Sequence, residues 1–249
     1  MKWKTFLASA LLVGLFFSCK KDSSNNAQNN PNKLKMYIED ATNTSFNEID
    51  SFNFTYDGNN RITSLFSPKL KTAFTYTSNS SFTIDLYTYG VLNVHEIAYI
   101  NSSSLVDSTF QYNNTGDTTT EGYLYSGKTL LRISNYNYSK ASGAQILAQD
   151  DYTSDNNGNM TKDIQSDGSG NIITISTFTY TNNPLNYYLG PTYLPQSKFL
   201  PATQVQTDGS GGPIASVTYS YVFDSSNRVV KETDALDNGE SVVKTFIYY

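Results

Sequence analysis

Few residues in this chain could do chemistry, since its 249 residues include one histidine and one cysteine. His95 lies between Val94 and Glu96. A histidine can act as a general base near neutral pH, but nucleophilic catalysis needs an activated Ser or Cys in a defined geometry. No such motif accompanies His95, so we predict a structural or surface histidine.

Carboxylates could act in pairs, as in glycoside hydrolysis. Asp150 and Asp151 are adjacent in a segment that is typical of a strand. Neighbouring strand residues point to opposite faces, so these two carboxylates cannot form a pair on one side. We therefore predict that the chain is not an enzyme.

Calcium is a second chemistry to consider. Asp155, Asn157 and Asn159 have the 1-3-5 spacing of an EF-hand loop, but the sixth position is Met160 where that loop requires glycine. The run from Asp167 departs from the pattern in the same way. Turn formation already accounts for these residues, so we predict no metal and no cofactor.

The cysteine lies in a segment that directs export. Lys2 and Lys4 precede an apolar run from Phe6 to Phe17, which is too short to span a bilayer and typical of a secretory signal. Cys19 follows at once, and as the only cysteine it cannot form an internal disulfide. The segment resembles a bacterial lipoprotein signal, apart from Phe16. That resemblance implies lipidation of Cys19 and a membrane partner through the lipid.

The chain then divides into three parts. We predict a signal peptide over residues 1–18, a flexible Asn- and Ser-rich tether over 19–35, and a single β domain over 36–249. The tether has one alanine as its only apolar residue between Lys20 and Lys33, so it cannot repay the entropy of ordering. The expected location is the outer membrane, with the periplasmic and cell-surface faces both open.

Composition and periodicity predict the fold of the third part. The chain has 20 Tyr and 14 Phe, residue types that favour strands. Apolar and polar residues alternate, as at Phe52, Phe54 and Tyr56, and about 16 candidate strands can be counted. We predict an all-β antiparallel hairpin meander that forms a strongly curved sheet or open barrel-like shell, without substantial helix.

Recurring turns separate the strands. Tyr56–Ile62 aligns with Phe223–Val229, and weaker copies follow elsewhere. Asp can accept hydrogen bonds from the turn backbone, while Asn and Gly tolerate a positive φ. The residues assigned to these structural turns are Asp57, Asn60, Asp155, Gly158, Asp167, Gly170, Asp224 and Asn227.

These turns resemble the YD repeats of Rhs and teneurin-like shells. The overall plan resembles the Bacteroidetes lipoproteins of unknown function grouped as DUF4595, in which a lipoprotein signal precedes YD-like hairpins and a late Asn-Pro segment. Here that segment runs from Thr181 to Tyr188, and the junction from Ser18 to Asp22 reads SCKKD. The resemblance implies a porin-like β fold and carries no assigned activity.

Two segments leave alternatives open. Residues 182–201 hold four of the seven prolines and several aromatics, which could plug an open end or present a binding surface; we favour the plug. The aromatic C-terminus from Lys244 to Tyr249 is typical of a membrane-spanning barrel, or of a strand that simply closes the sheet. Ser, Thr and Asn on both strand faces favour the second.

The acidic character of the chain, with a net charge of −5 and a pI near 4.8, excludes a nucleic-acid footprint. We predict a lipid-anchored envelope protein with a non-catalytic scaffold or interaction role. The alternative is a surface glycan- or polymer-binding lipoprotein that uses exposed tyrosines. An envelope protein or a polysaccharide is the expected partner.

Overall fold

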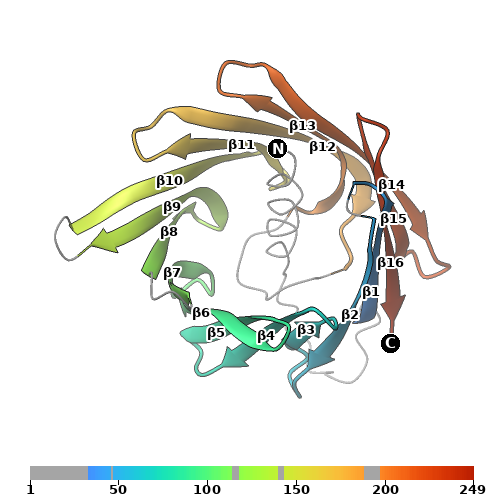
Figure 1. Cartoon of the computed structure of the whole chain (residues 1–249), viewed down its shortest axis with the longest axis horizontal. Helices are drawn as coiled ribbons and strands as arrows, with labels where there is room; N and C mark the ends of the chain where they lie inside the picture. Colours follow the sequence, from blue (N-terminus) through green and yellow to red (C-terminus); the bar gives the residue numbers. More distant parts are fainter. Residues whose placement is uncertain (1–32, 46, 114–117, 140–142, 188–196) are drawn as a thin grey trace.

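Sixteen antiparallel strands form a closed barrel in a computed structural model, which describes residues 33–45, 47–113, 118–139, 143–187 and 197–249 (Figure 1). Each strand pairs with the next in the chain, and the last pairs with the first. The strands are β1 (Leu34–Asn43), β2 (Ile49–Tyr56), β3 (Ile62–Phe66), β4 (Leu70–Tyr76), β5 (Ser81–Thr88), β6 (Val91–Ile100), β7 (Val106–Asn113), β8 (Thr118–Ser126), β9 (Thr129–Ser139), β10 (Gly143–Ser154), β11 (Met160–Asp167), β12 (Ile172–Pro184), β13 (Phe199–Asp208), β14 (Pro213–Phe223), β15 (Val229–Leu236) and β16 (Ser241–Tyr248).

The all-β prediction is confirmed, and the described residues contain no helix. The seam between β1 and β16 turns the expected curved sheet into a closed barrel, with Tyr37 opposite Phe246. The Asn43 amide donates to the Ser241 hydroxyl at 3.0 Å at one end of this seam. The C-terminal strand therefore closes the sheet. Within the described ranges, no helix is long and apolar enough to cross a membrane.

Alternation along the strands sorts the side chains between the barrel interior and the outer wall. Phe52 and Phe54 point inward and are buried, whereas Thr55 between Phe54 and Tyr56 is exposed. The buried apolar core is concentrated on one part of the inner wall, from β1 to β7 and from β13 to β16. Its members are Leu34, Tyr37, Phe52, Phe54, Ile62, Leu65, Phe74, Phe82, Ile84, Ala98, Val106, Tyr187, Leu200, Val229 and Phe246.

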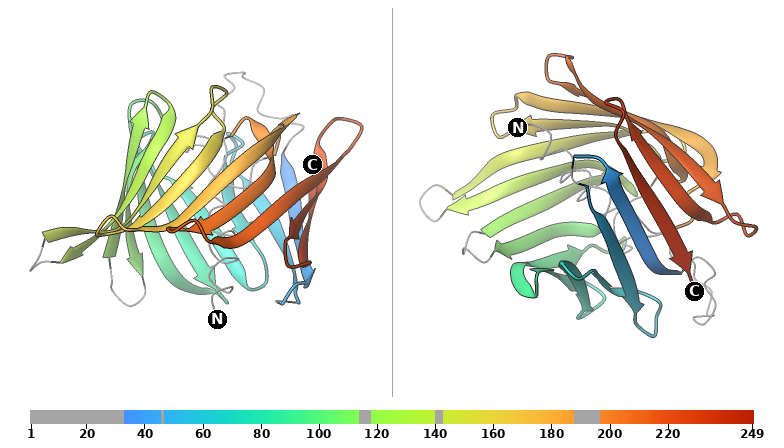
Figure 2. Two further views of the ribbon diagram at one scale, coloured as in Figure 1. Left: turned by 90° about the horizontal axis from the view of Figure 1, so that it is seen from above. Right: turned by 45° about the vertical axis from the view of Figure 1, so that its right-hand side comes forward.

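The hairpin turns lie at the two rims of the barrel (Figure 2). In the turn after β2, Oδ1 of Asp57 accepts from the amides of Asn59 and Arg61, both at 2.9 Å, and Oδ2 accepts from Arg61 Nε at 2.7 Å. Asn60 has a φ of 59° and donates its N–H to the Asp57 carbonyl. The carboxylate thus satisfies the backbone of its own turn.

The same arrangement recurs in four other turns, where an Asp is followed three residues later by a residue with positive φ. The pairs are Asp155 with Gly158, Asp167 with Gly170, Asp208 with Gly211, and Asp224 with Asn227. Hydrogen bonds from these turns hold the pKa of each of the five carboxyls below its usual range, against the opposing effect of partial burial. Short local sequence therefore sets the geometry of five hairpins.

Candidate functional site

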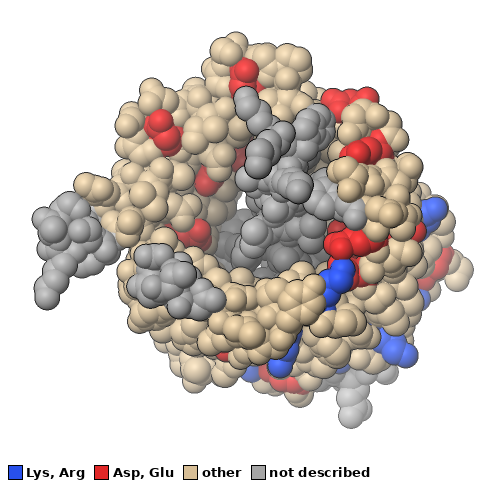
Figure 3. Space-filling model, viewed as in Figure 1, with Lys and Arg blue, Asp and Glu red and all other residues tan. Residues whose placement is uncertain are grey.

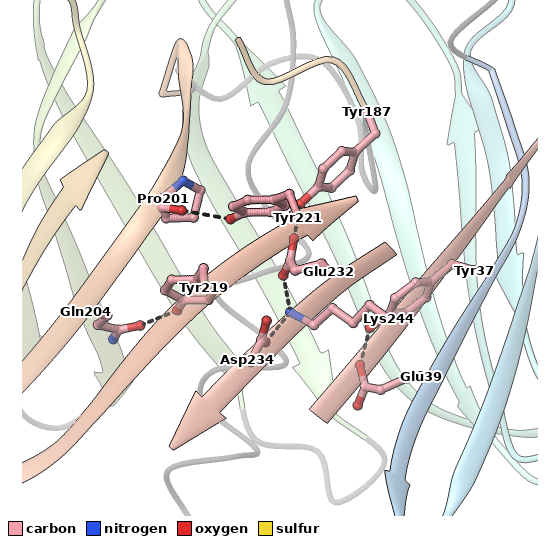
Figure 4. A network of polar contacts seen from close by, with 10 residues as sticks. All are labelled: Tyr37, Glu39, Tyr187, Pro201, Gln204, Tyr219, Tyr221, Glu232, Asp234 and Lys244. Carbon is pink, nitrogen blue, oxygen red and sulfur yellow. Dashed lines mark hydrogen bonds and ion pairs between the residues drawn. The ribbon is translucent and has the colours of Figure 1, made fainter. Parts of the chain in front are cut away.

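A network of polar side chains lies on the inner wall where β14, β15, β16 and β1 meet (Figure 4). Lys244 on β16 is at its centre. Its Nζ is 2.7 Å from Oε1 of Glu232 and 2.6 Å from Oδ2 of Asp234, both on β15. Glu232 is 3% exposed, so this is a buried ion-pair network rather than a surface one. We call these three residues the lysine cluster.

Charge pairing decides the protonation of the lysine cluster. Burial alone would lower the pKa of Lys244, but the charges of Asp234 and Glu232 raise it well above its usual value. Burial opposes ionisation of Glu232 as well, yet Lys244 and the hydrogen bond from Tyr187 hold the pKa of that carboxyl down. For Asp234, burial outweighs the lysine and raises the pKa. Lys244 therefore stays protonated, and a protonated amine is no nucleophile or base.

Tyrosines enclose the lysine cluster. The Tyr187 hydroxyl donates to Oε2 of Glu232 at 2.5 Å, and its ring lies 4.4 Å from that of Phe246. Tyr187 belongs to the proline-rich segment and is buried, while residues 182–184 and 199–201 of that segment lie in β12 and β13. Tyr188 and Tyr193 lie outside the described residues, so the plug stays a prediction. Tyr219 and Tyr221 on β14 donate to Gln204 and to the Pro201 carbonyl, and Tyr37 donates to Glu39.

A second group of carboxylates faces the interior from the opposite part of the wall. Glu96 on β6 shares a face with the core residue Ile84, which is its partner on β5. The pairing register carries that inner face across the following strands to Glu121 on β8, Asp150 on β10 and Asp163 on β11. We call these four residues the acidic arc. Asp and Glu side chains are visible on the wall of the central hollow in Figure 3.

The acidic arc differs from the lysine cluster in its electrostatics. Burial, followed by the charge of Glu121, raises the pKa of Glu96 to about 8. Burial also raises the pKa of Asp150 to about 6 and of Asp163 to about 7, helped by charges within the arc and at Asp151. Glu96, Asp150 and Asp163 therefore sit in positions that disfavour their charged forms.

Only some of the carboxyl oxygens in the acidic arc accept hydrogen bonds. Tyr123 donates to Oε2 of Glu121 at 2.6 Å, and Gln165 hydrogen-bonds Asp150. Oδ1 of Asp163 is buried without a hydrogen-bond partner in the described part of the barrel. A buried carboxylate oxygen without a partner is destabilising, and Oδ1 of Asp234 in the lysine cluster is in the same position.

Two predictions about individual residues can be compared with the structure directly. Asp150 faces the interior and Asp151 faces outward, where Oδ1 is 2.5 Å from Nε of Arg132, so the predicted separation of the two carboxylates is confirmed. His95 lies on the outer wall with Nδ1 2.6 Å from Oδ1 of Asp85, its cross-strand partner. It is a partly exposed surface histidine, as expected.

The residues considered for metal binding form hydrogen bonds within their own turn. Oδ1 of Asp155 accepts from the amides of Asn157 and Asn159, and Oδ2 accepts from the Asn159 side chain. No group of three or more His, Cys, Asp or Glu side chains among the described residues is placed to hold a metal ion. Cys19 lies outside the described residues.

Sequence reasoning missed the acidic arc and the lysine cluster. Each member of the arc lies on a different strand, and only the pairing register brings the four onto one face. A usable signal existed at Glu96, which alternates with Val94 and Ala98 on what reads as an inward face. A charged residue at a position where the alternation along the strand predicts an inward, apolar side chain indicates a buried charge.

No protein-family model matches the chain, and no curated protein sequence matches it. Its fold is similar to two solved structures. One is a porin-like protein from Bacteroides uniformis ATCC 8492, at 11% identity and a TM-score of 0.63, covering 88% of this chain and 98% of that one. The other is a porin-like protein from Bacteroides vulgatus ATCC 8482, at 13% identity and a TM-score of 0.62, covering 88% and 99%. The likeness is one of fold: this chain folds as a porin-like barrel.

Proposed function

We propose that the chain is a lipid-anchored protein of the outer membrane whose barrel stands outside the bilayer and serves a non-catalytic binding role. The observation that carries this proposal is the chemistry of the outer wall. A membrane-spanning barrel presents an outward apolar band to the lipid. On β14 the outward positions between Ile214 and Val222 are instead Ser216, Thr218 and Ser220.

Other strands repeat this polar middle. Exposed Thr179 on β12 and Thr203 on β13 join their hydroxyls at 2.7 Å across the outer wall. The outward ion pair of Arg132 with Asp151 lies on the same surface. Charged and hydroxyl side chains at these positions are costly in hydrocarbon and unremarkable in water. The lipid on Cys19 would then supply the membrane attachment that the barrel wall does not.

Two expectations belong to this proposal rather than to the fold. The resemblance to DUF4595 and to YD repeats stays a prediction, as does the absence of catalysis. Support for a non-catalytic role comes from the lysine cluster, because Lys244 is held protonated between two carboxylates. The partner we expect is an envelope protein or a polysaccharide of the envelope.

The alternative, capture of a glycan by exposed tyrosines, has less support. Among the described tyrosines, those with large exposed fractions are Tyr89, Tyr99, Tyr112 and Tyr249, and the first three lie on the convex outer wall or a rim turn. Polymer binding calls for a row of aromatics on a concave face. Most other tyrosines take part in the inner wall.

Detergent phase partition of the full chain tests the proposal. The native protein should enter the detergent phase and incorporate labelled fatty acid, whereas Cys19→Ser should do neither. Ser23→Ala, a matched change in the predicted tether, should behave like the native protein. If Cys19→Ser, once its apolar segment up to Ser18 has been removed, still enters the detergent phase, the barrel wall itself contacts lipid and the proposal is wrong. Protease treatment of intact cells then distinguishes the cell-surface face from the periplasmic face.

A further inference from the structure

The lysine cluster holds the three groups that a covalent cross-link within the chain requires. An amine and a carboxyl condense to an amide when the fold keeps them in contact and a neighbouring base takes a proton from the ammonium. Lys244 carries the amine, Asp234 a carboxyl in contact with it, and Glu232 a carboxylate on its other side (Figure 4). The register of β15 with β16 sets Lys244 directly opposite Glu232.

The contact distances in the lysine cluster suit this reaction. Nζ of Lys244 is 2.6 Å from Oδ2 of Asp234, so Cγ of Asp234 lies one covalent bond beyond the atom already in contact. Groups that a fold holds about 3–3.5 Å apart react far faster than the same groups free in solution. Oε1 of Glu232 is 2.7 Å from the same nitrogen, which is within reach of direct proton transfer.

Glu232 is held in place from its other side. The Tyr187 hydroxyl donates to Oε2 at 2.5 Å, while Nζ of Lys244 donates to Oε1 at 2.7 Å. The two oxygens therefore have separate partners, and Oε1 is the one that faces the amine. Tyr187 is thus a positioning residue for the carboxylate.

Burial favours the product of the condensation. The side chains of Lys244 and Asp234 are 22% and 14% exposed, and the rings of Tyr187 and Phe246 lie 4.4 Å apart beside the cluster. An ammonium and a carboxylate are costly to bury, whereas the amide that replaces them carries no charge. Burial also raises the pKa of Asp234, which favours the protonated carboxyl that can lose water.

An exposed group of the same composition provides a contrast within the molecule. Lys69, in the turn between β3 and β4, has Nζ 2.8 Å from Oε2 of Glu48 and 3.6 Å from Oδ1 of Asp50. The side chains of Lys69 and Glu48 are 38% and 50% exposed, so water stabilises their charged forms. The same three residue types therefore lack, at this turn, the burial that favours a neutral amide.

We propose that Lys244 and Asp234 form an isopeptide bond, with Glu232 as the proton acceptor. The ammonium form of Lys244 does not react, so its first step is the transfer of one proton to Glu232. The free Nζ then attacks Cγ of protonated Asp234, and the N–C bond forms as a C–O bond of the carboxyl breaks. The oxygen leaves as water with its own proton and a second proton from Nζ, and the first proton stays on Glu232.

The reaction consumes no oxidant, reductant or other co-reactant. It happens once in each chain and acts on no substrate, so it is separate from the proposed binding role and from the lipid anchor. Because β16 also pairs with β1, the bond would fix the strand that closes the barrel covalently to β15.

Tryptic digestion of the purified full-length protein after denaturation, followed by mass spectrometry, tests the bond. Trypsin cleaves after a lysine only when its amine is free. We expect a peptide that begins at Glu232, continues past Lys244 without cleavage and is lighter than its sequence by one water molecule. Lys69 is the internal control and should be cleaved normally, without loss of water at Glu48 or Asp50.

Variants of the two carboxyls sharpen the test. Glu232→Gln and Asp234→Ala should each restore cleavage after Lys244 and the full mass of the sequence, in protein that circular dichroism shows to be folded. Asp234→Asn keeps a group that an amine can attack, so it should form the same bond with loss of ammonia in place of water.

Three outcomes would overturn the proposal. One is cleavage after Lys244 with no loss of mass in the folded native protein, which would leave an ordinary ion pair. Another is loss of water with Lys244 still cleaved, which would indicate ring closure at Asp234. The third is the same link in folded Glu232→Gln, which would remove Glu232 from the reaction. The peptide does not contain Cys19, so the anchor and the isopeptide bond can fail separately.

Discussion

Two groups of buried carboxyls on the inner wall of the barrel have different electrostatic surroundings. Glu232 and Asp234 lie within 3 Å of the Lys244 amine, with tyrosines around them. Glu96 and Asp163 face the interior from the other side with no described cation beside them. The comparison shows that one barrel wall pairs some of its interior carboxyls with a lysine and leaves others, among the described residues, without a cation.

Removal of Lys244 should have the largest effect, because it converts the lysine cluster into a second set of unpaired acids. We expect Lys244→Met to lower the free energy of unfolding by about 3–5 kcal/mol, the usual effect of removing one partner from a buried ion pair. Urea denaturation followed by circular dichroism measures it. Lys231→Met on the outward face of β15 is the control and should stay within about 0.5 kcal/mol. Equal stability of the two variants would contradict the comparison.

The pH dependence of stability should be next in size and should come from the acidic arc. Glu96 ionises near its ordinary pKa when unfolded but near pH 8 when folded. Between these values the folded state binds more protons, so stability falls as the pH rises. We expect Glu96→Gln to reduce that fall by on the order of 2 kcal/mol between pH 5 and pH 8.

Urea denaturation at pH 5, 6, 7 and 8 measures this slope for the native protein and for Glu96→Gln. Glu48→Gln serves as the exposed control, and its slope should match that of the native protein. A native protein that becomes more stable from pH 5 to pH 8 would show that the arc is not held in its uncharged form.

Turn carboxylates provide the smallest expected effect, since they are satisfied locally and lie near solvent. Asp57→Ala removes acceptors from two backbone amides and from Arg61, so we expect a loss of about 1–2 kcal/mol. Asp57→Asn keeps an acceptor oxygen and should lose about half as much. Thermal melts of the two variants measure the difference. If Asp57→Ala lowered the free energy of unfolding more than Lys244→Met does, the expected order of lysine cluster, acidic arc and turn carboxylates would be wrong.

Local sequence was enough to predict much of the barrel. Alternation at Phe52, Phe54 and Tyr56 predicts inward aromatics, and the Asp57 turn shows why hairpins follow one another. About 16 strands were expected and 16 are found. Each of these features depends on residues a few positions apart, where propensity and turn chemistry act.

Register and closure were beyond such reasoning. Asp150 was correctly separated from Asp151, but its alignment with Glu121 and Asp163 depends on how three hairpins slide past one another. A shift of one residue would turn any of these acids outward. Lys244 and Glu232 meet for the same reason, through the pairing of β15 with β16.

The seam between β1 and β16 determines the order in which the barrel can be assembled. Sixteen pairings close the sheet, and all except this one join strands that are neighbours in the chain. The hairpins can therefore form as the polypeptide emerges, whereas β1 waits for a partner some 198 residues away. A chain that stopped short of β16 would keep two open strand edges, which invite pairing with other chains. Pairing of β16 with β1 is thus the step that removes the two exposed strand edges and closes the barrel.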